Sequence, residues 1–256
     1  IDLGADAAYI EAELKKMNSG MSETKSSTDG ARSSLQGLGT ALKALAVGAT
    51  GKKLYDWLIG SNAEMEQYVT SFTVMRGSAE KAQAMIKSMT EFAAATPLEL
   101  TDIVSAGQLL MNYGVAAEDL IPTMQKLGDL AGGNAEKMNR VALAYGQMLA
   151  KGKVTGEELR QMTEAGVPLL QTLAETMGKT TAEVQDLSSK GKVGINDLNN
   201  AITSLTTGSG KFAGMMEQQS QTMNGMLSTM KDNFDQLGRD IGEGAFQEIK
   251  GTLQEV

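Results

Sequence analysis

Side chains that could carry out catalysis or bind a metal are scarce in this sequence. It contains no His and no Cys, which removes the commonest general base, the usual zinc ligands, thiol nucleophiles and disulfides. The 31 Asp and Glu residues are spread along the polar faces of the expected helices, whereas acid–base catalysis needs a carboxylate held in an apolar or charge-paired cleft. The sequence therefore predicts that the protein is not an enzyme and has no catalytic, cofactor-binding or metal-binding residues.

Two glycine-rich segments look like parts of a phosphate-binding loop, 48–52 (GATGK) and 208–211 (GSGK). In such a loop, backbone amides surround the phosphates, and a Ser or Thr after the Lys holds magnesium. The required first glycine is replaced by Ala46 in one segment and by Leu205 in the other, and neither Lys is followed by Ser or Thr. Neither segment is therefore predicted to bind a nucleotide.

Composition and charge narrow the fold class and the range of ligands. Aromatic residues make up 4% of the chain and Pro occurs three times, while Ala, Leu, Gln, Glu and Lys fill stretches of 3.6-residue periodicity, which indicates helices throughout. The net charge of −8 argues against direct nucleic-acid binding, because it repels phosphates. The longest weakly polar stretch, Ala44–Ala49, is far shorter than the ~18 residues of a membrane-spanning helix. The sequence predicts a soluble, all-α protein.

Within an expected helical arm of residues 1–50, the first 45 residues carry a heptad pattern, with apolar and small residues spaced alternately by four and three. A 3.5-residue period favours the pairing of helices, and glycines and serines between 19 and 30 weaken the helix midway. Two interpretations remain open: a hairpin that folds back on the rest of the chain, and an intermolecular coiled coil. The candidate self-association residues are Leu3, Ile10, Leu14, Met17, Leu35, Leu38, Leu42 and Leu45.

Residues 51–240 are predicted to form a compact domain of short, capped helices. Ser78 is placed to cap one helix, whose expected apolar stripe is Ala82, Met85, Ile86, Met89, Phe92 and Ala93. Threonines followed three residues later by Glu predict capping boxes at 96–99, 155–158 and 180–183. Glycines separate the periodic runs. Residues 241–256 are expected to begin a connection to further chain, because the sequence starts at Ile1 rather than Met and ends within a polar helical pattern.

Two features of this domain need interpretation. The segment KGKV at 151–154 recurs at 190–193, each time between two expected helices, so two corners with the same turn geometry are predicted. Between Met215 and Met230, five methionines recur along a helical pattern. Methionines of this kind fill a core or form an adaptable binding stripe, and core filling is the favoured interpretation.

Several ordered segments together resemble the N-terminal domain of bacteriophage tape measure proteins. They are Phe92–Pro97, which is similar to the family's "fA-x-x-TP" segment, then Leu127–Ala131, Gly146–Lys153 and Leu159–Pro168. The resemblance runs from about residue 66 to residue 232. The motif residues expected to shape corners, rather than to do chemistry, are Thr96, Pro97, Gly152, Gln161, Gly166 and Pro168.

The resemblance implies a structural and assembly protein of a long-tailed phage or prophage. It would be assembled in the bacterial host cytoplasm, lie in the lumen of the virion tail, set tail length and leave at DNA ejection. The implied partners are tail tube and tail tip proteins, tail assembly chaperones and further copies of itself at a low number such as three. Because an α-helix advances about 1.5 Å per residue, a ruler must be a rod, so the measuring segment is expected mostly outside these residues.

Two other classes of function remain as alternatives. One is a helical scaffold or interaction module unrelated to phage tails. The other is a membrane-active effector that touches a membrane only after ejection, an alternative raised by the small residues around Gly37–Gly51 beside Trp57.

Overall fold

The computed structural model describes residues 51–222 and the individual positions 232, 235, 236, 239, 240, 243 and 247. The chain divides into two compact units, one of residues 1–66 with 235–256 and the other of residues 67–234. The heptad-patterned arm, residues 1–50, lies outside the described residues, so the hairpin and the coiled coil both stay predictions.

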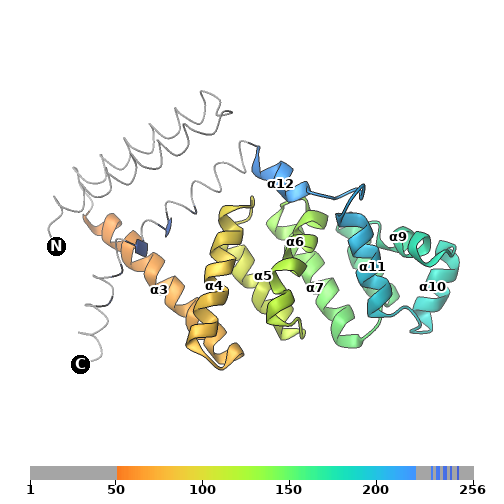
Figure 1. The fold of residues 1–256 in the computed structure, drawn as a ribbon, viewed down its shortest axis with the longest axis horizontal. Coiled ribbons are helices and arrows are strands. Elements are labelled where there is room, and N and C mark those ends of the chain that lie inside the picture. The colour runs from red at the N-terminus through yellow and green to blue at the C-terminus, as the bar shows by residue number, and fades with distance from the viewer. Residues whose placement is uncertain are drawn as a thin grey trace. The chain divides into compact units, whose positions relative to one another are not determined.

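The described part is built from helices, in agreement with the predicted all-α class (Figure 1). Within it the only β-type pairing is an isolated antiparallel bridge between Lys153 and Gly194. No helix there is both long and apolar enough to cross a membrane. The elements are α3 (Gly51–Arg76), α4 (Ala79–Ala94), α5 (Leu100–Asn112), the 3-10 helix η1 (Ala117–Asp119), α6 (Leu120–Ala131), α7 (Ala135–Lys151), α8 (Gly156–Glu164), α9 (Leu169–Met177), α10 (Thr181–Ser189), α11 (Ile195–Thr206) and α12 (Met215–Ser220).

In the unit of residues 67–234, each helix packs on its neighbours in a continuous series. Helix α4 packs on α5, α5 packs on α6 and α7, and α6 joins α7 to α11. Helix α11 packs on α9, which contacts α8 and α10, and α12 returns to lie on α6. Figure 1 shows this progression from α4 to α10. The short helices therefore depend on one another for burial of their apolar faces, because isolated helices of this length are marginal in water.

Helix α4 shows how the sequence pattern becomes structure. The Ser78 hydroxyl accepts a hydrogen bond from the backbone N–H of Lys81 at 3.4 Å, as the predicted cap requires. Gly77, at φ +67°, ends the preceding helix in the left-handed region that favours glycine. The predicted apolar stripe is buried as a whole, namely Ala82, Met85, Ile86, Met89, Phe92 and Ala93.

At three glycines inside helices, large side chains from other elements pack directly against the helix backbone. A Cβ built on any of them would lie closer than 3 Å to a neighbouring side chain, a separation that real Cβ atoms do not show. These glycines therefore let their neighbours approach the helix backbone. The pairs are Gly107 with Met89, Gly128 with Met216, and Gly146 with Tyr113.

One predicted capping box is wrong. Helix α5 begins at Leu100, its cap residue Glu99 makes no side-chain capping bond, and the buried Thr96 hydroxyl has no hydrogen-bond partner. Thr96 instead extends the end of α4, because its N–H donates to the Ala93 carbonyl. Pro97 disfavours helix at the residue before it. Leu98 is then buried in the core, so the next helix starts later than predicted.

The other two predicted boxes have different outcomes. Thr180 and Glu183 form a complete capping box, with bonds in both directions. Thr155 is the cap residue of α8, but its side chain caps no backbone N–H. Its hydroxyl donates to the carboxylate of Glu158 instead. The box at 180–183 is confirmed, and the one at 155–158 is replaced by a side-chain network.

Candidate functional site: the paired corners and the end of α6

The two KGKV corners have the same backbone geometry. Gly152 and Gly191 have φ values of +68° and +65°, respectively. The N–H of Lys153 donates to the Met148 carbonyl at 3.2 Å, and the N–H of Lys192 donates to the Leu187 carbonyl at 2.8 Å. In both corners the glycine follows the helix and the next residue bonds back across its last turn, which is the Schellman arrangement. The predicted common turn is confirmed.

The structure also brings the two corners together, which the sequence did not indicate. The N–H of Val154 donates to the Val193 carbonyl at 2.9 Å, beside the bridge between Lys153 and Gly194. The Ser188 hydroxyl donates to the Val154 carbonyl at 3.0 Å, and both valines are fully buried. The repeated KGKV segment thus marks two chain passages that pair with each other.

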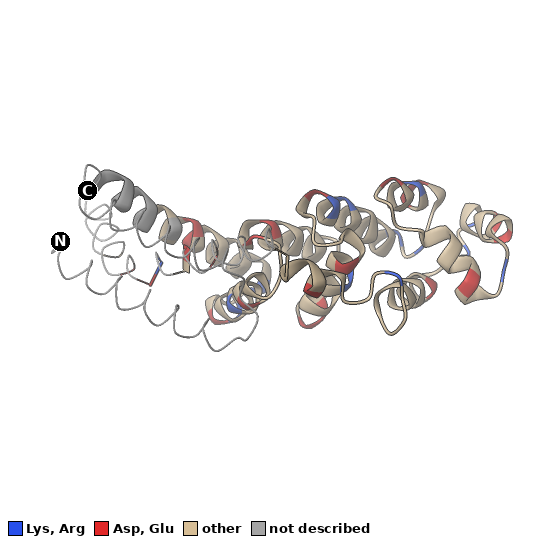
Figure 2. Ribbon diagram, turned by 90° about the horizontal axis from the view of Figure 1, so that it is seen from above, with Lys and Arg blue, Asp and Glu red and all other residues tan. Residues whose placement is uncertain are grey.

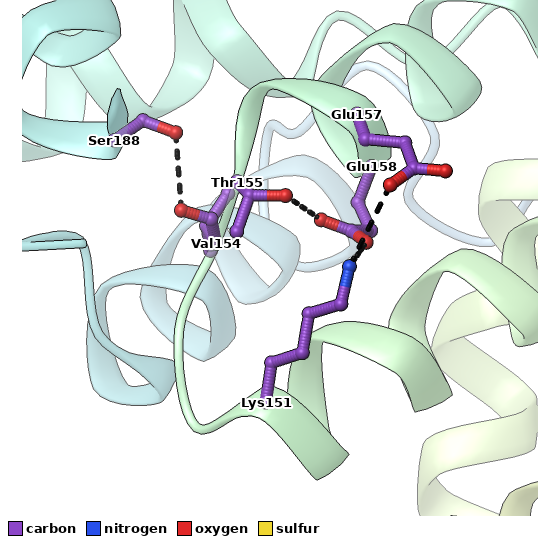
Figure 3. Close-up of polar contacts among 6 residues, drawn as sticks. All are labelled: Lys151, Val154, Thr155, Glu157, Glu158 and Ser188. Atoms are coloured by element: carbon purple, nitrogen blue, oxygen red, sulfur yellow. Dashed lines mark hydrogen bonds and ion pairs between the residues drawn. The ribbon is translucent and has the colours of Figure 1, made fainter. Parts of the chain in front are cut away.

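A buried carboxylate fastens the first corner (Figure 3). Glu158 has no exposed surface, and its carboxylate accepts from the Lys151 ammonium at 2.5 Å and from the Thr155 hydroxyl. The same ammonium lies 3.7 Å from the Glu157 carboxylate, which is exposed. Lys151 ends α7 and Glu158 lies in the first turn of α8, so the ion pair spans the corner.

Electrostatics keep Glu158 ionised despite its burial. Burial acts to raise the pKa of Glu158, but the hydrogen bonds from Lys151 and Thr155 outweigh it and hold the pKa below its ordinary value. The hydrogen bond to Glu158 correspondingly raises the pKa of Lys151. Both carboxylate oxygens are occupied by partners of the same corner. The arrangement suits fixing the angle between α7 and α8, not proton transfer to a ligand.

The second corner has no equivalent ion pair across it. The position that matches Glu158 is Asp197, whose carboxylate accepts only from the N–H of Gly194 at 2.9 Å. Lys190 pairs backward along its own helix with Asp186 at 2.6 Å. The first corner is therefore held by side-chain charges, and the second by backbone bonds and by its pairing with the first.

Four of the motif residues predicted to shape corners surround α8. Gly152 precedes α8, Gln161 lies half-buried within it, and Gly166, at φ +79°, follows it. Pro168 is the cap residue of α9. The structure thus gathers this part of the motif around one short helix and the turns that flank it.

The remaining two motif residues, Thr96 and Pro97, belong to a different place, the end of α6. A Cβ on Gly133, just after α6, would lie 2.4 Å from Pro97 Cγ and 3.4 Å from Gln219 Cβ. Pro97, the turn after α6 and helix α12 therefore meet at one junction.

Asp129 is a structurally important residue that was not among the predicted site residues. It lies in α6, is 4% exposed, and its carboxylate accepts from the backbone N–H of Met216 in α12 at 2.9 Å. Burial raises the pKa of Asp129, and the bond from Met216 only partly offsets this. The signal available in the sequence was an acid inside the apolar run Leu127–Ala131, a position where a charge is costly without a partner.

A pocket of about 430 Å³ lies beside η1, with walls from α6, α7 and α11. Inside it the Tyr145 hydroxyl donates to the Asn199 side-chain oxygen at 3.2 Å. Burial and the nearby Asp119 carboxylate raise the pKa of Tyr145. Within the described residues no group of three or more acids could hold a metal ion. The pocket therefore presents a hydrogen-bonded polar pair, Tyr145 and Asn199, on its wall.

Comparison with known proteins decides the family. The family model described as "Tape measure protein" matches residues 56–243. The chain belongs to the tape measure protein family. Membership assigns it to a family of structural proteins of phage tails. The capped helices and corners described above fall within the matched residues.

Individual phage and prophage proteins match most of this chain. The "Probable tape measure protein" of Escherichia phage Mu is 26% identical over 84% of this chain and 31% of its own length. The "Tape measure protein" of Lactococcus phage F4-1 is 23% identical over 91% of this chain and 64% of its own length. The Mu-like prophage FluMu protein gp42 of Haemophilus influenzae is 30% identical over 68% of this chain and 27% of its own length. No solved structure matches the chain.

Proposed function

We propose that this chain is the positioning head of a tail tape measure, which sets tail length while tube subunits polymerise around the rest of the molecule. The observation that carries the proposal is the family match over residues 56–243. The alignments cover 31% of the length of the Mu relative and 64% of that of the F4-1 relative, which leaves further chain in both for a measuring segment.

The helix lengths support the division into head and ruler. The longest described helix, α3, has 26 residues and is roughly 39 Å long at 1.5 Å per residue. Helices α8, α9 and α10 have nine residues each, and turns reverse the chain between them. A fold of short helices joined by reversing turns has a small end-to-end length for its number of residues. The measuring role therefore falls on other residues of the parent protein.

Electron microscopy of tails tests this division. In-frame deletions in the parent gene beyond this region should shorten tails by a constant amount per residue removed. A variant that weakens the corners, such as Glu158→Ala, should lower the number of tails without changing their length. Tails shortened by the corner variant, or unchanged in length by the deletions, would refute the proposal.

The domain organisation is part of the proposal. Residues 1–50 form the self-associating arm, residues 51–240 the head, and residues 241–256 the start of the connection to the ruler. The arm brings a few copies together through Leu3, Ile10, Leu14, Met17, Leu35, Leu38, Leu42 and Leu45. Sedimentation equilibrium of the chain with and without residues 1–50 is the test. Oligomers are expected only with the arm, and monomers in both samples would mean that the heptads form a hairpin.

The proposed partners are tail tube and tail tip proteins and tail assembly chaperones, with the molecule in the tail lumen until DNA ejection. The charge distribution supports this location. Figure 2 shows acidic and basic residues interspersed along the described helices, and the whole chain carries −8. A lumen component of this charge repels incoming DNA instead of retaining it. Co-purification of the chain with tube protein from infected cells tests the partner assignment.

A further inference from the structure

The segment after α11 buries few of its side chains. It comprises residues 207–222, called the strap here, and includes α12. Only Phe212 and Met216 of the strap are buried. Its backbone reverses through Gly208 and Gly214, with φ values of +59° and +64°. Most of its remaining residues are exposed, so little apolar burial holds it in place.

The first anchor of the strap is a cap supplied by another helix. Helix α12 has only six residues, and no side chain caps it from its own preceding residues. The carboxylate of Asp129 in α6 instead accepts from the N–H of Met216 at 2.9 Å. A helix start ordinarily receives such a bond from its own cap residue. Helix α12 therefore depends on a residue of α6 for its N-terminal capping bond, which a helix usually receives from its own cap residue.

The second anchor is the side chain of Met216. A Cβ on Gly128 would lie 2.2 Å from Met216 Sδ, so this methionine rests against the bare backbone of α6. The Met216 side chain is fully buried, in accordance with the core-filling interpretation of this methionine. These two anchors end on adjacent residues, Gly128 and Asp129, and Gln219 adds its contact with the turn at Gly133.

The near end of the strap is fixed separately. The N–H of Phe212 donates to the Leu205 carbonyl at 2.9 Å, and the Lys211 ammonium lies 5.6 Å from the centre of the Phe212 ring. The bond to Leu205 holds the beginning of the strap to the end of α11 without involving α6, and the lysine–ring contact lies within the strap. Loss of the α6 anchors would therefore leave helices α4 to α11 with their mutual packing intact.

We infer that residues 207–222 form a releasable strap, which detaches from α6 while α4 to α11 remain folded. Fully extended at ~3.3 Å per residue, the released strap would span roughly 50 Å. Release would thus lengthen the tether between this domain and the residues that follow. The inference rests on the contacts of α12 and does not depend on the proposed tail function.

Hydrogen exchange of the full 256-residue chain, followed by mass spectrometry, tests the strap. The amides of α12 should exchange much faster than those of α7, and Asp129→Ala should accelerate α12 by roughly tenfold to a hundredfold, as expected for loss of a charged hydrogen bond. The matched control is Asp197→Ala, which removes an equally long carboxylate bond, to Gly194. Asp197→Ala should accelerate the exchange of amides at the start of α11 and leave the exchange of the α12 amides unchanged. A common exchange rate for α12 and α7, or equal acceleration of both by Asp129→Ala, would overturn the inference.

A reversible crosslink provides a second test, because the chain has no cysteine of its own. The Cβ of a residue at 128 would lie 3.3 Å from the present Cγ of Met216, close to the separation of Cβ and the far sulfur in a disulfide. In the double variant Gly128→Cys, Met216→Cys, the oxidised monomer should lower α12 exchange to the level of α7, and reduction should restore it. Identical exchange in the two states would contradict a strap that opens, and a disulfide-linked dimer would show that α12 exchanges between copies instead.

Discussion

Two buried carboxylates, Glu158 at the first corner and Asp129 at the end of α6, solve the same problem by different means. Glu158 is paired with a lysine and a hydroxyl, and its pKa is lowered. Asp129 has a backbone N–H from α12 as its closest partner, and its pKa is raised. A cation compensates a buried charge more fully than a peptide dipole does. The difference shows that the ion pair makes the corner stable, whereas the attachment of α12 to α6 is only weakly stabilised.

The largest expected effect comes from removing the corner carboxylate. Glu158→Ala should lower the free energy of unfolding of the domain by about 2–4 kcal/mol, because it deletes two charge-assisted hydrogen bonds and leaves a cavity. Denaturant unfolding measured by circular dichroism is the assay. Glu157→Ala is the control, since this neighbour contacts the same lysine but is exposed, and should change stability by less than about 0.5 kcal/mol. Equal effects of the two variants would remove the distinction on which the comparison rests.

A smaller effect is the opposite pH dependence of the two acids. The stabilisation from Glu158 is present above the ordinary pKa of 4.5 and is lost as pH falls through its lowered pKa. For Asp129, stabilisation is present below 3.8 and is lost as pH rises through its raised pKa. As pH falls from 7 to 3, the wild type should lose part of its stability advantage over Glu158→Gln, and its stability relative to Asp129→Asn should improve. Unfolding curves at each pH provide the measurement, and changes of the same sign in both pairs would contradict it.

The smallest effect is expected from Asp129→Asn at pH 7. The amide oxygen can still accept from the Met216 N–H, and the cost of burying a charge disappears, so the stability should change by less than about 1 kcal/mol. The same thermal or denaturant assay applies. A loss of several kcal/mol would mean that the charge of Asp129, and not only its oxygen, holds α12.

The features that the sequence predicted well depend on the spacing of residues that are close together in the chain. The apolar stripe of α4, the cap at Ser78 and the glycine turns of the two corners involve residues within a few positions of one another. The wrong capping box at 96–99 is a local pattern overridden by packing, since Leu98 enters the core. A local sequence pattern predicts the backbone structure correctly where burial of a nearby side chain does not require a different backbone conformation.

The features that the sequence did not predict depend on backbone groups far apart in the chain. The pairing of Val154 with Val193 is one hydrogen bond between main-chain atoms, which no side-chain pattern records. The partner of Asp129 is likewise the amide of Met216, 87 residues away, and every non-proline residue has such an amide. The repeat KGKV and the acid within Leu127–Ala131 marked these places without indicating what they contact.

The bridge between the corners also determines how the domain would respond to tension. It joins residue 154 to residue 193, so α8, α9 and α10 lie on a closed loop between them. A pull along the chain would pass from α7 to α11 across that bond, and the Ser188–Val154 hydrogen bond and the packing of α11 on α9 would share the load. Because the two passages are antiparallel and would be pulled from the same end, their contacts would break one after another. The Lys151–Glu158 ion pair would be loaded after the bond between Val154 and Val193 had broken.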